Sequence, residues 1–311
     1  MIIFDFHCDT ISKIHDSAQD LQRNTFHVDI EKIPQDEKRI QFFAVFVKPG
    51  FSYLRSLLRT SSIISKYYEQ INANSKRIEH CNNCSGLFDA IINNKIASFL
   101  SIENAGEIFM DKLNIKSFYN LGVRCMGLTW NYDNMLGCGA FTQEDKGLSE
   151  DGRQVIEQMQ TLGILLDVSH LSEKTFWDAA EWSYAPLVAS HSNCRSICNS
   201  KRNLTDEQIK HIANTGGIIG INFYPEFLNN SKTADINDVI RHIEHVCSIA
   251  GPQYVCIGSD FDGIEETPTG LEDTSKINNI FEMLSRLNYS EKDIANIASA
   301  NFLRVASAYL S

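Results

Sequence analysis

The residues with the clearest chemical potential in this sequence are histidines and carboxylates that follow short apolar runs. His7 and Asp9 stand two residues apart at the end of the first run, so in an extended chain both side chains leave the same face. Other apolar runs end in Glu103, His170, His191, and Asp260 with Asp262. Imidazoles and carboxylates are ligands of zinc and of similar divalent ions. The sequence therefore predicts a metal site if one fold brings these residues together.

Two metal ions would account for this set better than one. Burying several histidines and carboxylates without partners costs several kcal/mol each, and a metal compensates that cost. His7 and Asp9 are candidates to hold the first ion, and His170 and His191 are candidates for the second. Glu103 lies between the two pairs in chain order and is the candidate bridge. A bridged pair of this kind generates hydroxide near neutral pH.

Eight short runs rich in Val, Ile and Phe, with helical stretches between them, predict parallel strands joined by crossovers. They are Ile2 to Cys8, Gln41 to Val47, Ile96 to Ile102, Val123 to Trp130, Gly163 to Ser169, Pro186 to Ser190, Gly217 to Phe223 and Tyr254 to Phe261. A doubly wound open sheet usually carries a Gly-rich turn after its first strand, whereas here that place reads HCDTISK. We therefore predict an α/β fold, a TIM-like (β/α)8 barrel of the metal-dependent hydrolase type, whose reacting groups gather at the carboxyl ends of the strands.

The predicted crossovers include three amphipathic helices. They span Glu173 to Trp182, Asp206 to Asn214 and Ile236 to Ile249, and Thr205 is the expected N-cap of the second. In the third, His242 and His245 lie one turn apart beside Glu244 and Arg241. That pattern favours a solvated helix face over a second metal site.

The composition of the whole chain limits the class of protein. The 311 residues, 43% of them hydrophobic and 22% charged, suit one barrel domain spanning 1–311. A net charge of -11 disfavours nucleic acid as a partner. The apolar runs are far shorter than the ~20 residues that cross a membrane, and Asp5 interrupts the N-terminal run where a signal peptide would be apolar. Nine scattered cysteines fit reduced thiols, so a cytoplasmic location is expected.

The sequence closely resembles the membrane dipeptidase (renal dipeptidase) family of zinc peptidases along nearly its whole length. The motifs that carry the resemblance are DFHCDT, FHVDIEKI before QFFAVFV, LSIENAGEI, MGLTWNYDN, DVSHLSEKTFWDA, PLVASHSNCRSICNSKRNLTD, GGIIGINFYPEF and HIEHVCSIAGPQYVCIGSDFDG. The paired DVSH and VASH segments, followed by NSKRNLTD and GSDFDG, are specific when taken together.

The resemblance implies a (β/α)8 barrel with two zinc ions that hydrolyses small dipeptides and tolerates a D-residue on the C-terminal side. It matches His7 and Asp9 to one zinc, His170 and His191 to the other, and Glu103 to the bridging carboxylate. It also matches Arg202 to the arginine that holds the C-terminal carboxylate of the substrate, and Asp260 to the acid/base residue. Tyr224 is expected either to wall the same pocket or to be an ordinary loop residue, and the family suggests a homodimer.

The sequence departs from the family pattern at two places. Trp130 stands where a histidine usually steadies the oxyanion, so Asn131 and the indole N–H of Trp130 are candidate replacements. ENAGE stands where EGG is usual, and Glu103 is preferred over Glu107 as the ligand because it is nearer the strand end.

The predicted function is that of a zinc-dependent dipeptidase. The alternatives are another binuclear amidohydrolase, acting on a lactam, cyclic amide or lactone, and a catalytically impaired metal-binding relative, of which Trp130 would be the first sign.

Overall fold

The chain, described over residues 1–109 and 112–310 in a computed structural model, is built around a closed parallel β-barrel. The strands are β1 (Ile2–Asp5), β2 (Lys38–Phe46), β3 (Ile78–His80), β4 (Ile96–Glu103), β5 (Val123–Gly127), β6 (Leu165–Asp167), β7 (Leu187–Ala189), β8 (Ile218–Ile221) and β9 (Val255–Ile257). They pair in the order β2-β1-β9-β8-β7-β6-β5-β4-β3, and a further pairing of β2 with β4 closes the ring. The barrel is thus the predicted (β/α)8 fold.

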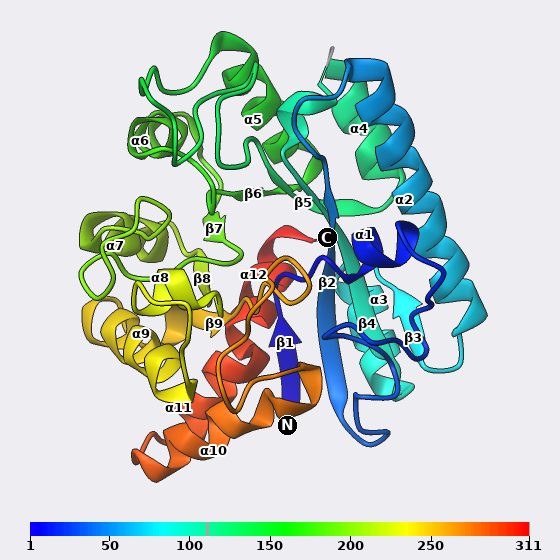
Figure 1. Cartoon of the computed structure of the whole chain (residues 1–311), viewed down its shortest axis with the longest axis vertical. Coiled ribbons are helices and arrows are strands. Elements are labelled where there is room, and N and C mark those ends of the chain that lie inside the picture. The colour runs from blue at the N-terminus through cyan, green and yellow to red at the C-terminus, as the bar shows by residue number, and fades with distance from the viewer. Residues whose placement is uncertain (110–111, 311) are drawn as a thin grey trace.

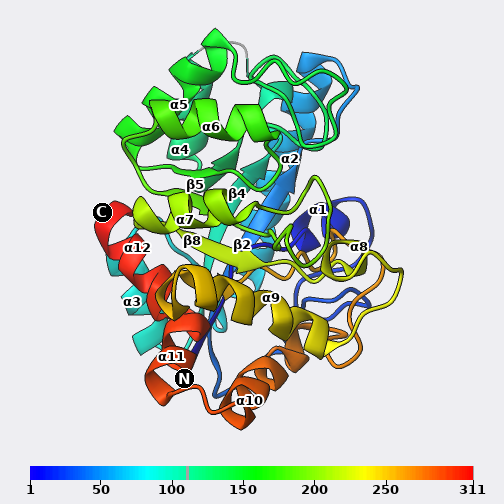
Figure 2. The same cartoon turned by 90° about the vertical axis from the view of Figure 1, so that its left-hand side faces the viewer.

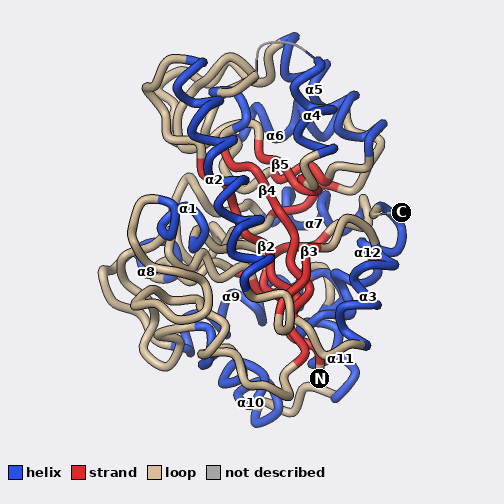
Figure 3. The backbone as a smooth tube through the Cα atoms, turned by 90° about the vertical axis from the view of Figure 1, so that its right-hand side faces the viewer, coloured by secondary structure: helices blue, strands red, loops and turns tan. Residues whose placement is uncertain are grey.

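Helices surround the barrel on its outer side (Figures 1 and 2). They are α1 (Thr10–His15), α2 (Tyr53–Ala73), α3 (Cys84–Ile92), α4 (Lys112–Asn120), α5 (Glu150–Leu162), α6 (Glu173–Trp182), α7 (Asp206–Asn214), α8 (Pro225–Leu228), α9 (Ile236–Ile249), α10 (Asn278–Arg286), α11 (Glu291–Ala295) and α12 (Asn301–Tyr309). The longest of them, α2, contacts β2 and β3 and runs in front of β2 in Figure 3. Among residues 1–109 and 112–310, no helix is long and apolar enough to cross a membrane.

The predicted elements agree closely with the observed ones. All eight predicted strands are present, although most are shorter than the apolar runs, and the helices α6, α7 and α9 have the predicted bounds. Thr205 caps α7 as expected, because its hydroxyl accepts from the Gln208 N–H while the Gln208 side chain accepts from the Thr205 N–H. The short strand β3 was not predicted. It pairs with the first residues of β4, ahead of the residues of β4 that pair with β5.

Two apolar clusters hold the barrel together. The larger one packs the strands against the surrounding helices. The smaller one contains residues of all eight barrel strands together with α3 and α12, and in it the Phe302 ring stacks on Phe4 at 4.0 Å between centroids. Because residues from opposite sides of the ring share this cluster, it fills the barrel interior. The candidate site residues lie outside this apolar cluster, at the carboxyl ends of the strands.

Candidate metal and substrate site

Six of the predicted site residues meet at the carboxyl ends of the barrel strands. They are His7 and Asp9 after β1, Glu103 at the end of β4, His170 after β6, His191 after β7 and Asp260 after β9. Strand β1 ends at Asp5, so His7 and Asp9 belong to the turn above the strand and Asp9 leads directly into α1. All six residues are largely buried. Residues that are distant along the chain therefore share one water-poor pocket.

Glu103 lies at the centre of the cluster. Its Oε1 is 2.8 Å from His170 Nε2 and its Oε2 is 3.4 Å from His7 Nε2. The Nε2 atom of His7 also approaches Asp9 Oδ2 at 3.3 Å. The two oxygens of one carboxylate thus face two separate groups of nitrogen and oxygen donors, which is the geometry of a bridging ligand.

The tautomers of His170 and His191 leave two lone pairs facing each other. His170 Nδ1–H donates to Asn131 Oδ1 at 2.9 Å, so its Nε2 carries no hydrogen. The Ser190 hydroxyl donates to Asp167 and accepts from His191 Nδ1 at 2.7 Å, so His191 Nε2 also carries none. The two Nε2 atoms nevertheless lie 2.9 Å apart. A cation between them would turn this repulsive contact into coordination.

A buried oxygen of Asp9 also fits a metal site. Asp9 Oδ1 is buried and has no hydrogen-bond partner among the described residues, although an unpaired buried carboxylate oxygen is costly. Ligand atoms of three residue sets lie within 4.8 Å of one another, and these sets are His7–Asp9–Glu103, Glu103–His170–His191 and His7–His191–Asp260. Imidazoles and carboxylates without thiolates suit zinc or a similar divalent ion. The donor set therefore fits the metal centre that the sequence predicts.

The protonation states of His170, His191 and Glu103 match a metal site. Burial, together with Arg202, lowers the pKa of His170 to about 4, and burial also lowers the pKa of His191 well below its usual value. Burial opposes ionisation of Glu103, but the imidazoles beside it outweigh burial and hold the Glu103 pKa well below the usual range. Two neutral imidazoles and one ionised carboxylate are the forms that bind a metal.

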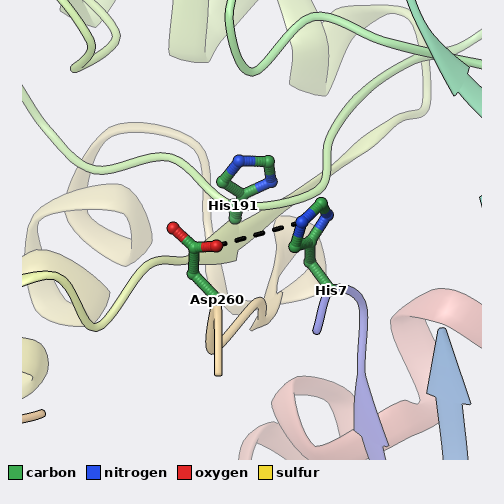
Figure 4. Close-up of side chains that lie close together, drawn as sticks. All are labelled: His7, His191 and Asp260. Carbon is green, nitrogen blue, oxygen red and sulfur yellow. Dashed lines mark ion pairs between the residues drawn. The ribbon is translucent and has the colours of Figure 1, made fainter. Parts of the chain in front are cut away.

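Asp260 lies beside His7 and His191 in the cluster. Its Oδ1 is 3.9 Å from His7 Nε2, with His191 beside both residues (Figure 4), and its Oδ2 accepts from Asn222 Nδ2 at 2.9 Å. Burial raises the pKa of Asp260 to about 7. Its φ of 61° lies in the left-handed region, which a non-glycine residue adopts only when its surroundings impose it. The backbone is therefore held in a conformation that presents this carboxylate to the site.

A cleft with two lobes opens above the cluster, and both lobes are lined by Trp130, His170, Asp260 and Gly263. The first, here named the arginine lobe, has a volume of 560 Å³ and is also lined by Asn131, Arg202 and Tyr224. The second, the lysine lobe, has a volume of 580 Å³ and is also lined by Lys13, Lys48 and Arg59. All ten predicted site residues thus lie in the cluster or line the cleft.

Arg202 is held rigidly at the base of the arginine lobe. Its guanidinium donates to the backbone oxygens of Ser169 and His191, the latter at 3.1 Å, and Nε has no partner among the described residues. Burial lowers the pKa of Arg202 to about 10, so the group remains a cation at neutral pH. Its other terminal N–H groups point at Ser192 Oγ, 3.4 Å away, and at His170 Nε2, 3.3 Å away, and a carboxylate that replaces these two partners would accept two parallel hydrogen bonds.

Some polar partners of the cluster were not predicted. Asp167 accepts from the backbone and hydroxyl of both Ser169 and Ser190, and so fixes the serine that holds His191. Asn222 holds Asp260. Asp167 ends the observed strand β6, two residues before Ser169 in the DVSH motif, and that position was the available signal.

Two further expectations have structural outcomes. Glu107 is absent from the candidate ligand sets of the described chain, whereas Glu103 belongs to two of them. The interpretation of His242 as part of a solvated helix face is wrong, because His242 is fully buried between Cys194 N and Leu228 O. His245 is partly exposed and pairs with Asp206 at 2.9 Å.

A closed parallel barrel with a cluster of imidazoles and carboxylates at its carboxyl end defines a metal-dependent hydrolase. The chain belongs to the membrane dipeptidase family (Peptidase family M19), whose model matches residues 1–309. An uncharacterized dipeptidase of Schizosaccharomyces pombe is 33% identical over 301 residues, which are 90% of this chain and 72% of that protein. An uncharacterized Klebsiella pneumoniae protein is 35% identical over 220 residues, 68% of this chain and 81% of that protein.

Solved structures agree in fold and class. A metallopeptidase described as dipeptidase AC has a TM-score of 0.92 and 26% identity, with 100% of this chain and 99% of that chain covered. A metallopeptidase from Rhodobacter sphaeroides, bound to a phosphinate mimic of the dipeptide L-Ala-D-Ala, has a TM-score of 0.92 and 25% identity, with 99% of each chain covered. The chain is therefore an enzyme of the metallo-dipeptidase type.

Proposed function

We propose that this enzyme is a zinc dipeptidase with two metal ions that accepts dipeptides with a D-residue at the C-terminus. The observation that carries the proposal is the Glu103 carboxylate, whose two oxygens face His170 and His7 beneath a cleft with a fixed arginine at its base. His7 and Asp9 would hold one ion, His170 and His191 the other, and Glu103 both. When bound, such a pair polarises a carbonyl and makes water nucleophilic near neutral pH.

Arg202 sets the length and direction of the substrate. Its guanidinium would bind the free C-terminal carboxylate through a bidentate contact, which fixes the peptide bond one residue away over Glu103. A longer peptide has no carboxylate at that position. Exopeptidase action on dipeptides follows from this geometry.

Asp260 moves the proton in this proposal. Its carboxylate lies above the cluster and lines both lobes, so it can take a proton from the attacking water and return it to the leaving amine. The Asn222 amide holds Oδ2, which leaves Oδ1 turned toward the cluster. One carboxylate thus serves as base and then as acid.

Trp130, Asn131 and Tyr224 have separate roles in the proposed site. Because Asn131 Oδ1 accepts from His170, we assign Asn131 to positioning that imidazole. The indole N–H of Trp130 is then the proposed donor to the oxyanion, since Trp130 lines both lobes. Tyr224 walls the arginine lobe, where its ring packs edge-on against Phe227.

A panel of L,L, L,D and D,D dipeptides, assayed with zinc and with a chelator, tests the proposal. We expect turnover of L,L and L,D dipeptides, its loss with chelator, and two zinc ions per chain by elemental analysis. Turnover of lactams or lactones in place of dipeptides would assign another amidohydrolase activity. Bound zinc without any turnover would indicate an impaired enzyme, and full activity after complete metal removal would contradict the metal mechanism.

A further inference from the structure

The two lobes of the cleft carry opposite charges. The lysine lobe contains the cations of Lys13, Lys48 and Arg59, which come from α1, the loop after β2, and α2. The arginine lobe is edged by the exposed carboxylates of Glu226, Glu265 and Glu266. These two groups of residues are far apart in the sequence, and the fold places them in the two lobes of the same cleft. A dipeptide bound across Glu103 would place one of its residues in the lysine lobe and the other in the arginine lobe.

The cations of the lysine lobe differ in how far they are neutralised. Arg59 makes two hydrogen bonds to the carboxylate of Asp16, at 2.7 Å and 2.5 Å, and this pairing lowers the pKa of Asp16. Lys13 and Lys48, in contrast, form no ion pair with any carboxylate in residues 1–109 or 112–310. The ammonium of Lys13 lies 5.9 Å from the centre of the Phe26 ring. Two lysines thus remain available to a ligand.

The carboxylates near the metal cluster do not cancel these lysines. Asp9 and Glu103 also line the lysine lobe, but they belong to the candidate ligand sets and would be neutralised by bound metal. Asp262 is buried, and its two oxygens already accept hydrogen bonds from Thr10 Oγ1 and from the backbone N–H of His27, the latter at 2.8 Å. Asp260 lines this lobe beside the cluster and Asp16 is paired with Arg59, so Lys13 and Lys48 are the charged groups of the outer wall that remain unpaired among the described residues.

The direction of the substrate then assigns each residue to a lobe. With its C-terminal carboxylate on Arg202, as in the proposed function on which this step rests, a dipeptide puts its C-terminal side chain in the arginine lobe. Its N-terminal side chain then enters the lysine lobe. We infer that the enzyme selects dipeptides whose N-terminal residue is acidic, with Lys13 and Lys48 as the residues that determine this specificity.

The acidic rim of the arginine lobe makes the selection directional. A C-terminal Asp or Glu side chain would approach Glu226, Glu265 and Glu266, where like charges repel it, with Lys232 as the one cation of the rim within the described residues. A neutral or basic C-terminal residue meets no such repulsion. Glu-Lys should therefore be a better substrate than Lys-Glu, although both have the same composition and net charge.

The test compares substrates that differ only in charge at the N-terminal side chain. Glu-Ala and Gln-Ala have nearly the same shape, and for the zinc-loaded enzyme we expect kcat/KM to favour Glu-Ala by about tenfold at low salt, as two partly exposed ion pairs allow. Added salt should reduce this ratio. In a Lys13→Gln, Lys48→Gln double variant the ratio should fall to near one.

Lys38→Gln is the matched control, because Lys38 is exposed at the start of β2, at the opposite end of the barrel. It should keep both the rate and the ratio. Equal or better turnover of Gln-Ala by the unmodified enzyme, or an unchanged ratio in the double variant, would overturn the inference while leaving the dipeptidase proposal intact. Failure to hydrolyse any dipeptide of the panel would instead refute the proposed function.

Discussion

At the scale of single residues, the site depends on hydrogen bonds that orient the candidate metal ligands. Asn131 fixes the ring of His170, and the Asp167–Ser190 pair fixes that of His191. Each contact selects the tautomer whose Nε2 lone pair faces Glu103. The imidazoles are therefore oriented before a metal arrives, which reduces the entropic cost of binding it.

Replacing Asp260 by Asn tests its proposed role in proton transfer. Asn is nearly isosteric, tolerates the left-handed backbone and cannot accept the proton, so kcat should fall about a hundred- to ten-thousandfold. Zinc content by elemental analysis should stay at the level of the unmodified enzyme. High activity with full zinc would exclude Asp260 as the acid/base residue, and loss of zinc would make it a ligand instead.

Replacing Arg202 by Lys tests carboxylate capture. Lysine keeps the charge but loses the bidentate fork, so kcat/KM for a free dipeptide should fall about a hundredfold. The matched substrate is the same dipeptide with a C-terminal amide, which lacks the carboxylate. The unmodified enzyme should discriminate strongly against the amide and the variant only weakly. Equal turnover of acid and amide by the unmodified enzyme would contradict the role of Arg202.

At the scale of elements, the position of His191 depends on the close approach of β7, β8 and β9. A Cβ atom at Gly258 would lie 1.8 Å from the Ser190 carbonyl oxygen, and one at Gly220 would lie 2.1 Å from it. Both glycines therefore leave room for the backbone that leads into His191. The packing of the sheet thus requires glycine at both positions, and a search restricted to polar residues would miss these glycines.

Gly258→Ala should therefore disturb stability and metal binding together. The methyl group has to displace backbone, which we expect to cost about 1–3 kcal/mol of unfolding free energy and to weaken zinc binding through His191. Urea unfolding and zinc titration measure the two effects. Gly86→Ala in α3 is the control, since a Cβ there meets its nearest atom at an ordinary 3.5 Å, and it should be neutral or stabilising. Unchanged zinc affinity in Gly258→Ala would argue against this coupling.

At the scale of the whole molecule, the sequence predicts the barrel well because its strands are short, apolar and regularly spaced. The polar residues at the strand ends could be found because a parallel barrel places them at one end. Strand β3 has three residues, Ile78–His80, and is too short to give a pattern. His242 was misread because its neighbours Arg241 and Glu244 are polar, whereas α9 turns His242 inward. The charge difference between the lobes also needed the structure, since it joins loops from opposite ends of the chain.

Buried His242 makes the stability of the whole molecule dependent on pH. Its Nδ1 accepts from Cys194 N–H at 3.0 Å and its Nε2–H donates to Leu228 O at 2.9 Å, so only the neutral ring satisfies both contacts. Burial accordingly lowers the pKa of His242 to about 4, from 6.5 in an unfolded chain. Between these values the unfolded state binds more protons, so stability decreases as pH falls from about 6.5 toward 4.

Urea unfolding of zinc-loaded enzyme between pH 7.5 and 4.5 measures this effect. One proton taken up on unfolding gives a slope of about 1.4 kcal/mol per pH unit, and His242→Gln, which cannot titrate, should reduce the slope by up to that amount. His245→Gln is the control on the same helix, because His245 pairs with Asp206 in a partly exposed position. This variant should keep most of the dependence of stability on pH. A slope that is the same in His242→Gln and in the unmodified enzyme would mean that His242 is already protonated in the folded state. Its hydrogen bond from Cys194 would then have to be broken, which NMR titration of the His242 ring would reveal.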